Sequence, residues 1–225
     1  MNIKVAGFQK NSFIDYPGKI ASVIFLGGCN FVCYYCHNNN ILCYDSNKMP
    51  FSKVLSELKK QVGFVDAVVI TGGEPTLHPQ LREIIKQVKA LGFLVKLDTN
   101  GTNSELLKEL DVDYIAMDIK APLEKYKDVV GVNVDTNQIK KSIEYIKSRD
   151  NYMFRTTLAP VLTENDIKEI GKLVKGAKVF QLQQFVPNEF SNKRKVVHLP
   201  YSIDDAKKFE LLLSKYCDKV ILRGF

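Results

Sequence analysis

Residues 21–38 read ASVIFLGGCNFVCYYCHN, an apolar run that stops at two glycines and leads into three clustered cysteines. The β-branched, apolar residues 21–26 predict a strand of a parallel sheet. Gly27 and Gly28 end this strand, and the cysteines follow on the predicted loop. Because α/β sheets and barrels carry their sites at the carboxyl ends of the strands, this stretch indicates an α/β fold with a site after its first strand.

The same order of strand and then helix continues along the chain. It predicts further strands at residues 67–71, 94–98, 114–118, 153–158 and 178–183, and helices near residues 52–61, 79–91, 104–110, 137–148 and 165–174. A last helix and strand are expected within residues 202–224. This alternation is typical of βαβ units around a parallel sheet. The units are too few for a closed eight-stranded barrel, so a three-quarter barrel and a doubly wound sheet both remain open.

Residue types common in functional sites lie at or near the end of each predicted strand. They are Gly72, Gly73 and Glu74 after the second strand, Asp98 and Thr99 after the third, Asp118 and Lys120 after the fourth, Arg155 within the fifth and Gln183 at the end of the sixth. Because the carboxyl ends of parallel strands share one edge, we expect these residues to form one site. Arg155 interrupts an apolar strand, so its guanidinium needs an anionic partner, either a bound ligand or a structural carboxylate.

The cysteines indicate an iron–sulfur cluster. Cys29, Cys33 and Cys36 have the spacing C-x3-C-x2-C, whereas Cys43 and Cys217 stand apart and are expected to be buried or incidental. An odd number of clustered cysteines argues against a disulfide framework. Electron-transfer clusters normally have four cysteine ligands, so three ligands leave one iron open for chemistry. The alternative is a zinc site that also uses His37, although adjacent residues rarely converge on one tetrahedral ion.

Composition and charge favour one globular domain over residues 1–225. Of the residues, 45% are hydrophobic, and no Pro- or Gly/Ser-rich linker interrupts the chain. The net charge of +7 comes from lysines spread over predicted helices, with one tight basic cluster at residues 193–195. This distribution favours solvated helix faces over a nucleic-acid site. No apolar stretch has the length of a signal peptide or a membrane span, so a cytoplasmic protein is expected.

The cluster loop (residues 27–38), with Tyr35 before its third cysteine, resembles that of the radical S-adenosylmethionine (SAM) enzymes. The continuation Cys36-His37-Asn38 and the N-terminal GFQKNSFIDYPGK at residues 7–19 are similar to the activating proteins of glycyl radical enzymes. Among these, the activating proteins of anaerobic ribonucleotide reductase fit best, over residues 7–224. The resemblance implies a single-domain partial (βα)6 TIM-like barrel.

The resemblance also implies roles for individual residues. Cys29, Cys33 and Cys36 would hold a [4Fe–4S] cluster, with SAM chelating its open iron. The segment from Gly72 to Glu74 would bind the methionyl ammonium group, and Asp98 and Lys120 the amino-acid part of SAM. A monovalent cation would be ligated by the side chains of Asp98, Thr99 and Asp118 and by a backbone carbonyl near Ala116.

Nucleotide contacts are implied for Asn38 and Tyr35, the latter mainly through its backbone. Arg155 would face SAM or substrate. The ribose-contacting histidine of the pyruvate formate-lyase type is missing from FQLQQFVPNEF at residues 180–190, and Gln183 is the expected substitute.

The implied reaction is reductive cleavage of SAM to methionine and a 5′-deoxyadenosyl radical, which takes a Cα hydrogen atom from a glycine of a partner enzyme. That partner would be an anaerobic ribonucleoside-triphosphate reductase, and an external flavodoxin or ferredoxin would supply the electron. A radical SAM enzyme for a small molecule, peptide or RNA, and a non-catalytic Fe–S or zinc-binding protein, are the alternatives.

Overall fold

The computed structural model describes residues 3–187 and 199–225. The basic cluster at residues 193–195 lies outside the described residues. Contacts divide the chain into two compact units, each described here by itself. The first comprises Met1–Asn30, Asn38–Thr99 and Glu105–Ile115, and the second Phe31–His37, Asn100–Ser104 and Ala116–Phe225. No helix in the described ranges is long and apolar enough to cross a membrane.

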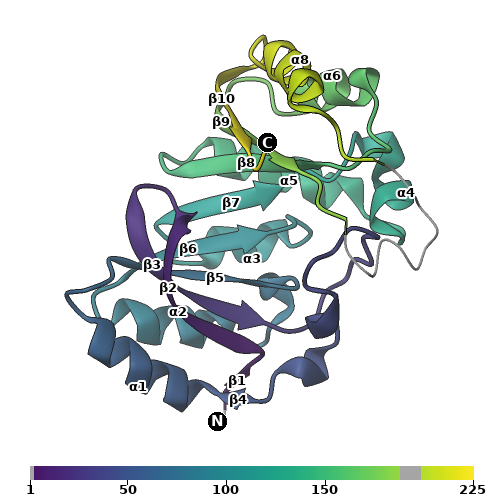
Figure 1. The fold of residues 1–225 in the computed structure, drawn as a ribbon. Coiled ribbons are helices and arrows are strands. Elements are labelled where there is room, and N and C mark those ends of the chain that lie inside the picture. The colour runs from purple at the N-terminus through teal and green to yellow at the C-terminus, as the bar shows by residue number, and fades with distance from the viewer. Residues whose placement is uncertain (1–2, 188–198) are drawn as a thin grey trace. The chain divides into compact units, whose positions relative to one another are not determined.

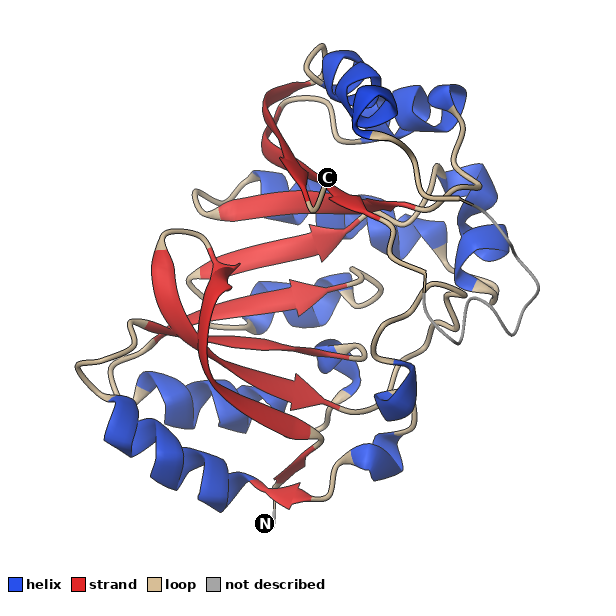
Figure 2. Ribbon diagram, in the orientation of Figure 1, coloured by secondary structure: helices blue, strands red, loops and turns tan. Residues whose placement is uncertain are grey.

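The sheet of the first unit follows the order of the sequence. Its strands are β2 (Gly7–Tyr16), β3 (Lys19–Leu26), β5 (Ala67–Gly72) and β6 (Leu94–Thr99). The strands β3, β5 and β6 run parallel, and β2 folds back antiparallel to β3 (Figure 2). A short antiparallel pair, β1 (Lys4–Val5) and β4 (Met49–Pro50), lies near the N-terminus.

Two helices of the first unit connect its parallel strands. They are α1 (Phe51–Gln61) and α2 (Leu81–Lys89), and both lie on the same side of the strands (Figure 1). Helix α2 buries Leu81, Ile84, Ile85 and Val88, the i, i+3, i+4, i+7 spacing of one helical face. Because parallel crossovers are right-handed, successive helices are placed on one face and leave the strand ends open for a site.

The second unit repeats this winding. Its strands are β7 (Tyr114–Asp118, whose first two residues belong to the first unit), β8 (Tyr152–Leu158), β9 (Ala177–Gln184) and β10 (Cys217–Arg223), in that order. The strands β8, β9 and β10 are parallel. The helices are α4 (Tyr126–Val130), α5 (Thr136–Lys147), α6 (Glu164–Leu173) and α8 (Ile203–Leu213), and α6 and α8 lie side by side (Figure 1).

Short helical elements complete the described chain. Helix α3 (Ser104–Glu109) precedes β7, and single 3₁₀ turns occur at Asn39–Ile41, Tyr44–Ser46, Pro75–Leu77 and Leu123–Lys125. The turn Pro75–Leu77 matters for the site because it directly follows Glu74, the residue that caps it.

The predicted alternation of strands and helices is confirmed. The strand at residues 114–118 has the predicted bounds, and the other predicted strands differ only at their ends. Strand β2 was not predicted, because its sequence is polar and its register shifts twice, so it shows no clean alternation. In each unit the strand order follows the sequence without the reversal that defines a doubly wound sheet, which favours barrel-type winding.

Candidate active site

The first predicted cluster ligand lies against the glycine pair that follows β5. The N–H of Gly73 donates to the carbonyl of Leu26, and the N–H of Glu74 donates to the carbonyl of Gly28, both at 2.8 Å. A Cβ atom on residue 73 would lie only 2.1 Å from the Gly28 oxygen. Only glycine therefore allows this approach. The start of the cluster loop and the GGEP loop (residues 72–75) are packed together within the first unit.

The far end of the cluster loop contacts the same GGEP loop. The side-chain amide of Asn38 donates to the carbonyl of Gly72 at 2.7 Å. Residues 41 and 42 then lie beside the start of the cluster loop. There the N–H groups of Gly28 and Cys29 donate to the carbonyls of Ile41 and Leu42. Both ends of the cluster loop are thereby fixed by backbone groups, which holds Cys29 in place.

Asn47 also fixes the end of β3, and the sequence analysis missed it. Its buried carboxamide accepts from the N–H of Gly27 at 2.8 Å and donates to the carbonyl of Gly27 at 3.1 Å. The sequence around it, SNKMP, is polar and looks like an ordinary loop. No sequence signal distinguishes this asparagine, because its partner lies twenty residues away.

Glu74 is buried and its carboxylate is used within the loop. The Oε1 atom accepts from the N–H of Thr76 at 3.0 Å and from the hydroxyls of Thr76 and Thr99 at 2.5 and 2.8 Å. Glu74 is only 1% exposed. These contacts join the end of β5 to the end of β6. Through Oε1, the side chain of Glu74 therefore helps to shape the loop.

Asp98 has a cationic partner that the sequence analysis did not consider. The ammonium of Lys96 contacts Oδ1 of Asp98, and the hydroxyl of Thr71 donates to Oδ2 at 3.3 Å. The Lys96 side chain is only 3% exposed. Its signal was present in the sequence, since a lysine inside the apolar run LVKLD needs an anion just as Arg155 does.

The other two predicted cluster cysteines belong to the second unit. The N–H of Cys36 donates to the carbonyl of Cys33 at 3.1 Å, forming a tight turn. The Cys33 thiol is buried, which raises its pKa, while the positive charge of Lys120 opposes that rise. The ammonium of Lys120 lies 6.0 Å from the centre of the Tyr35 ring. A cation beside the thiols favours their thiolate form, which is the form that binds iron.

Tyr35 is 5% exposed, and its hydroxyl has no hydrogen-bond partner within the described chain. Burial raises the pKa of this phenol well above its ordinary value, so the hydroxyl remains protonated. A buried hydroxyl without a partner is uncommon and marks a place where a ligand atom can bind.

Asp118, Lys120 and Arg155 form one ion-pair cluster. The Nε atom of Arg155 lies 2.7 Å from Oδ1 of Asp118, and the Nζ atom of Lys120 lies 3.0 Å from Oδ2. Burial alone would raise the pKa of Asp118, but the charges of Arg155 and Lys120 outweigh it and hold that pKa well below its usual value. Arg155 thus has the structural carboxylate that was one of its two expected partners.

Gln183 lies on β9 between Thr157 of β8 and Arg223 of β10. Its side chain is half-buried. Of the predicted site residues, the first unit contains Cys29, Asn38, Gly72, Gly73, Glu74, Asp98 and Thr99, and the second contains Cys33, Tyr35, Cys36, Asp118, Lys120, Arg155 and Gln183.

The five cysteines are not joined in disulfides. All five thiols are free, with Cys43 exposed and Cys217 buried. Within the described residues, no three His, Cys, Asp or Glu side chains form a group that could hold a single metal ion.

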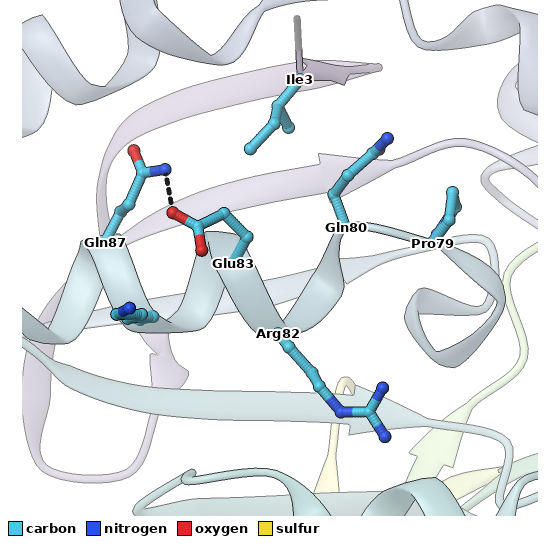
Figure 3. A pocket seen from close by; sticks show the side chains of 7 residues that line it. Ile3, Pro79, Gln80, Arg82, Glu83 and Gln87 are labelled. Carbon is cyan, nitrogen blue, oxygen red and sulfur yellow. Dashed lines mark hydrogen bonds between the residues drawn. The ribbon is translucent and has the colours of Figure 1, made fainter. Parts of the chain in front are cut away.

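A separate hollow of about 480 Å³ lies over α2, lined by polar side chains such as Arg82, Glu83 and Gln87 (Figure 3). None of the predicted site residues lines it.

Comparison with known proteins gives consistent matches. The profile of the Radical SAM superfamily matches residues 23–174. A predicted glycyl-radical enzyme activating enzyme of Methanocaldococcus jannaschii is 37% identical over 235 residues, covering 99% of this chain and 97% of that protein. The pyruvate formate-lyase-activating enzyme of Clostridium pasteurianum is 24% identical, and its alignment covers 97% of this chain and 96% of that enzyme. Streptococcus suis SuiB bound to S-adenosylmethionine has a TM-score of 0.69 at 13% identity, covering 90% of this chain and 52% of SuiB.

Proposed function

Because this chain belongs to the radical SAM superfamily, and within it to the family of glycyl-radical enzyme activating enzymes, we propose that it removes a hydrogen atom from the Cα of one glycine in a partner enzyme. It holds a [4Fe–4S] cluster through Cys29, Cys33 and Cys36 and binds SAM at the open iron. The observation that carries the proposal is the packing of Gly73 on the Gly28 carbonyl. This packing sets the expected methionine-binding loop directly against the first cluster cysteine.

The chain's own residues bind and orient the two cofactors. When bound, the cluster supplies the electron that splits SAM into methionine and a 5′-deoxyadenosyl radical. The GGEP loop receives the methionyl ammonium group, and the contacts of Glu74 Oε1 with Thr76 and Thr99 hold the loop in shape. Lys120 faces the methionyl carboxylate, and Asp98 faces the methionyl ammonium group. Tyr35 and Asn38 contact the nucleotide, and Gln183 contacts the ribose.

Arg155 acts by holding Asp118 in place. Its 2.7 Å contact with that carboxylate supports a positioning role. The side chains expected to ligate a monovalent cation have other partners, so the proposal does not include that ion. All 225 residues are proposed to form one radical SAM core domain that works in the cytoplasm.

The proposed partner is an anaerobic ribonucleoside-triphosphate reductase, with a flavodoxin or ferredoxin as the electron donor. The Cys36-His37-Asn38 sequence and the N-terminal segment at residues 7–19 support this choice. The absence of the ribose-contacting histidine within residues 180–190 argues against a pyruvate formate-lyase partner. The similarity to the Clostridium pasteurianum enzyme makes pyruvate formate-lyase the partner to test beside it.

The first experiment tests the cluster and its ligands. We expect anaerobically reconstituted, reduced protein to give a [4Fe–4S]⁺ electron paramagnetic resonance (EPR) signal whose g-values shift when SAM is added. Cys29→Ala, Cys33→Ala and Cys36→Ala should each lose this cluster. Cys43→Ala is the matched control and should keep it, because Cys43 is exposed and outside the cluster loop. A SAM-responsive cluster in any of the first three variants contradicts the ligand assignment.

The second experiment tests the partner. The reduced enzyme, SAM and an anaerobic ribonucleotide reductase should together give the EPR doublet of a glycyl radical. The same mixture with pyruvate formate-lyase should not. A doublet with only pyruvate formate-lyase would replace the proposed partner. Formation of 5′-deoxyadenosine without a doublet from either protein would favour a different radical SAM substrate.

A further inference from the structure

The side chains expected to ligate a monovalent cation are used elsewhere in this chain. In the first unit, Thr99 donates its hydroxyl to Glu74 at 2.8 Å. Asp98 precedes Thr99 on β6, so strand pleating directs the two side chains to opposite faces of the sheet. Asp98 lies with Lys96 on one face, and Thr99 lies on the other. The two side chains therefore have different partners within the first unit.

Lys96 already provides a cation to Asp98. Its ammonium contacts Oδ1 of Asp98, while Thr71 donates to Oδ2, so both carboxylate oxygens have partners. The Lys96 and Asp98 side chains are 3% and 14% exposed. A buried ammonium is stable only beside an anion, and a buried carboxylate likewise needs a cation. Each of these two side chains thus meets the requirement of the other without an added ion.

In the second unit, the carboxylate of Asp118 is compensated in the same way. Arg155 lies on one of its oxygens at 2.7 Å and Lys120 on the other at 3.0 Å. Two fixed cationic groups leave no uncompensated negative charge on this carboxylate. Both acidic residues of the expected cation site therefore carry cations that belong to the chain.

We propose that Lys96, through its contact with Asp98, takes the place of the monovalent cation, so that SAM binding in this enzyme depends on neither K⁺ nor Na⁺. Lys96 is a positioning residue in this role, since it keeps the Asp98 carboxylate compensated and fixed at the end of β6. The inference concerns SAM binding alone. It is tested without any partner protein and can fail while the proposed glycine chemistry holds.

The test measures SAM affinity in potassium, sodium and choline chloride at equal ionic strength. The reconstituted protein is used, with the SAM-induced g-value shift and titration calorimetry as readouts. We expect the wild-type dissociation constant to change by less than about twofold between the salts. In Lys96→Met the ammonium is lost, and we expect affinity in choline to fall about tenfold or more and to recover in K⁺ or Na⁺, since one charge-assisted contact is worth about that factor.

Two further variants make the test specific. Lys96→Arg keeps the charge and should stay independent of K⁺. Lys89→Met breaks another lysine ion pair of the first unit, with Asp113, and should also show no dependence. Urea unfolding in each salt is the second readout, in which K⁺ should stabilise only Lys96→Met.

Three outcomes overturn the proposal. They are a tenfold loss of wild-type affinity in choline, a Lys96→Met variant that binds SAM equally well in every salt, and K⁺ dependence in Lys96→Arg. If Lys96→Met folds only with K⁺ or Na⁺ present, the proposal is supported. If it folds in no salt, the wild-type and Lys96→Arg affinities decide.

Discussion

Gly73→Ala should disrupt the cluster through backbone displacement alone. The added Cβ would lie 2.1 Å from the Gly28 oxygen and 3.2 Å from the Cβ of Cys29. Because real Cβ atoms essentially never approach within 3.0 Å, the two backbones must separate by about 0.9 Å in total. Metal–ligand distances tolerate only about 0.2 Å. Even half of this displacement, taken up by the cluster loop, exceeds what the bond from iron to the Cys29 thiolate can absorb.

The cost in stability and in activity follows from the same movement. The 2.8 Å hydrogen bonds from Gly73 and Glu74 to the backbone of β3 and of the cluster loop would be weakened or lost. Losing one or two such bonds costs about 1–3 kcal/mol of unfolding free energy. A misplacement of about 1 Å near the reacting groups lowers the rate by about 100-fold.

The assay compares iron and sulfide content, the SAM-dependent EPR shift and 5′-deoxyadenosine formation in Gly73→Ala with those of wild type. Gly7→Ala is the matched control, because its Cβ would meet the Phe25 side chain at an ordinary 3.6 Å. Full iron content, with a SAM shift and turnover within about twofold of wild type, would refute the steric reasoning.

Two further substitutions test charges in the fold. Arg155→Met should lower the unfolding free energy by about 1–3 kcal/mol in urea titrations, because it removes a charge-assisted contact from Asp118. The exposed control Lys60→Met should change the unfolding free energy by less than about 0.5 kcal/mol. Equal effects of the two substitutions would refute a special role for Arg155. His78 is buried with both ring nitrogens bonded to backbone groups, and burial lowers its pKa. Stability should therefore fall as pH drops below the unfolded pKa of about 6.5 and towards the folded pKa. His78→Gln should flatten that decline in urea titrations across this pH range. An unaltered decline in His78→Gln contradicts the assignment.

Much of the fold could be predicted from the sequence because most strands are apolar runs that end at a glycine or a carboxylate. The match to the Radical SAM superfamily and the structural likeness to SuiB confirm the predicted α/β radical SAM fold. Polar strand β2 was missed, since its ladder depends on β3 and not on any pattern of its own. Local sequence cannot reveal partners that are distant along the chain.

The candidate site likewise has some features that the sequence could predict and others that it could not. The cysteines, the GGEP loop and the polar strand ends could be named as candidates from spacing, position and the family resemblance. The hydrogen bonds from Thr76 and Thr99 to Glu74 could not be predicted, because they depend on how the ends of β5 and β6 meet. The contact of Lys96 with Asp98 was within reach of sequence reasoning, since both residues lie on one face of one strand.

The carboxamide of Asn47 has a consequence for protein engineering. Its N–H and C=O groups bind both backbone groups of Gly27, as a neighbouring strand would, and so extend the ladder of β3 by one rung. A peptide that copies only residues 27–38 would lack this rung and the GGEP loop. The cluster loop therefore cannot be moved to another protein by itself. A scaffold that receives it must also supply an amide in the place of Asn47.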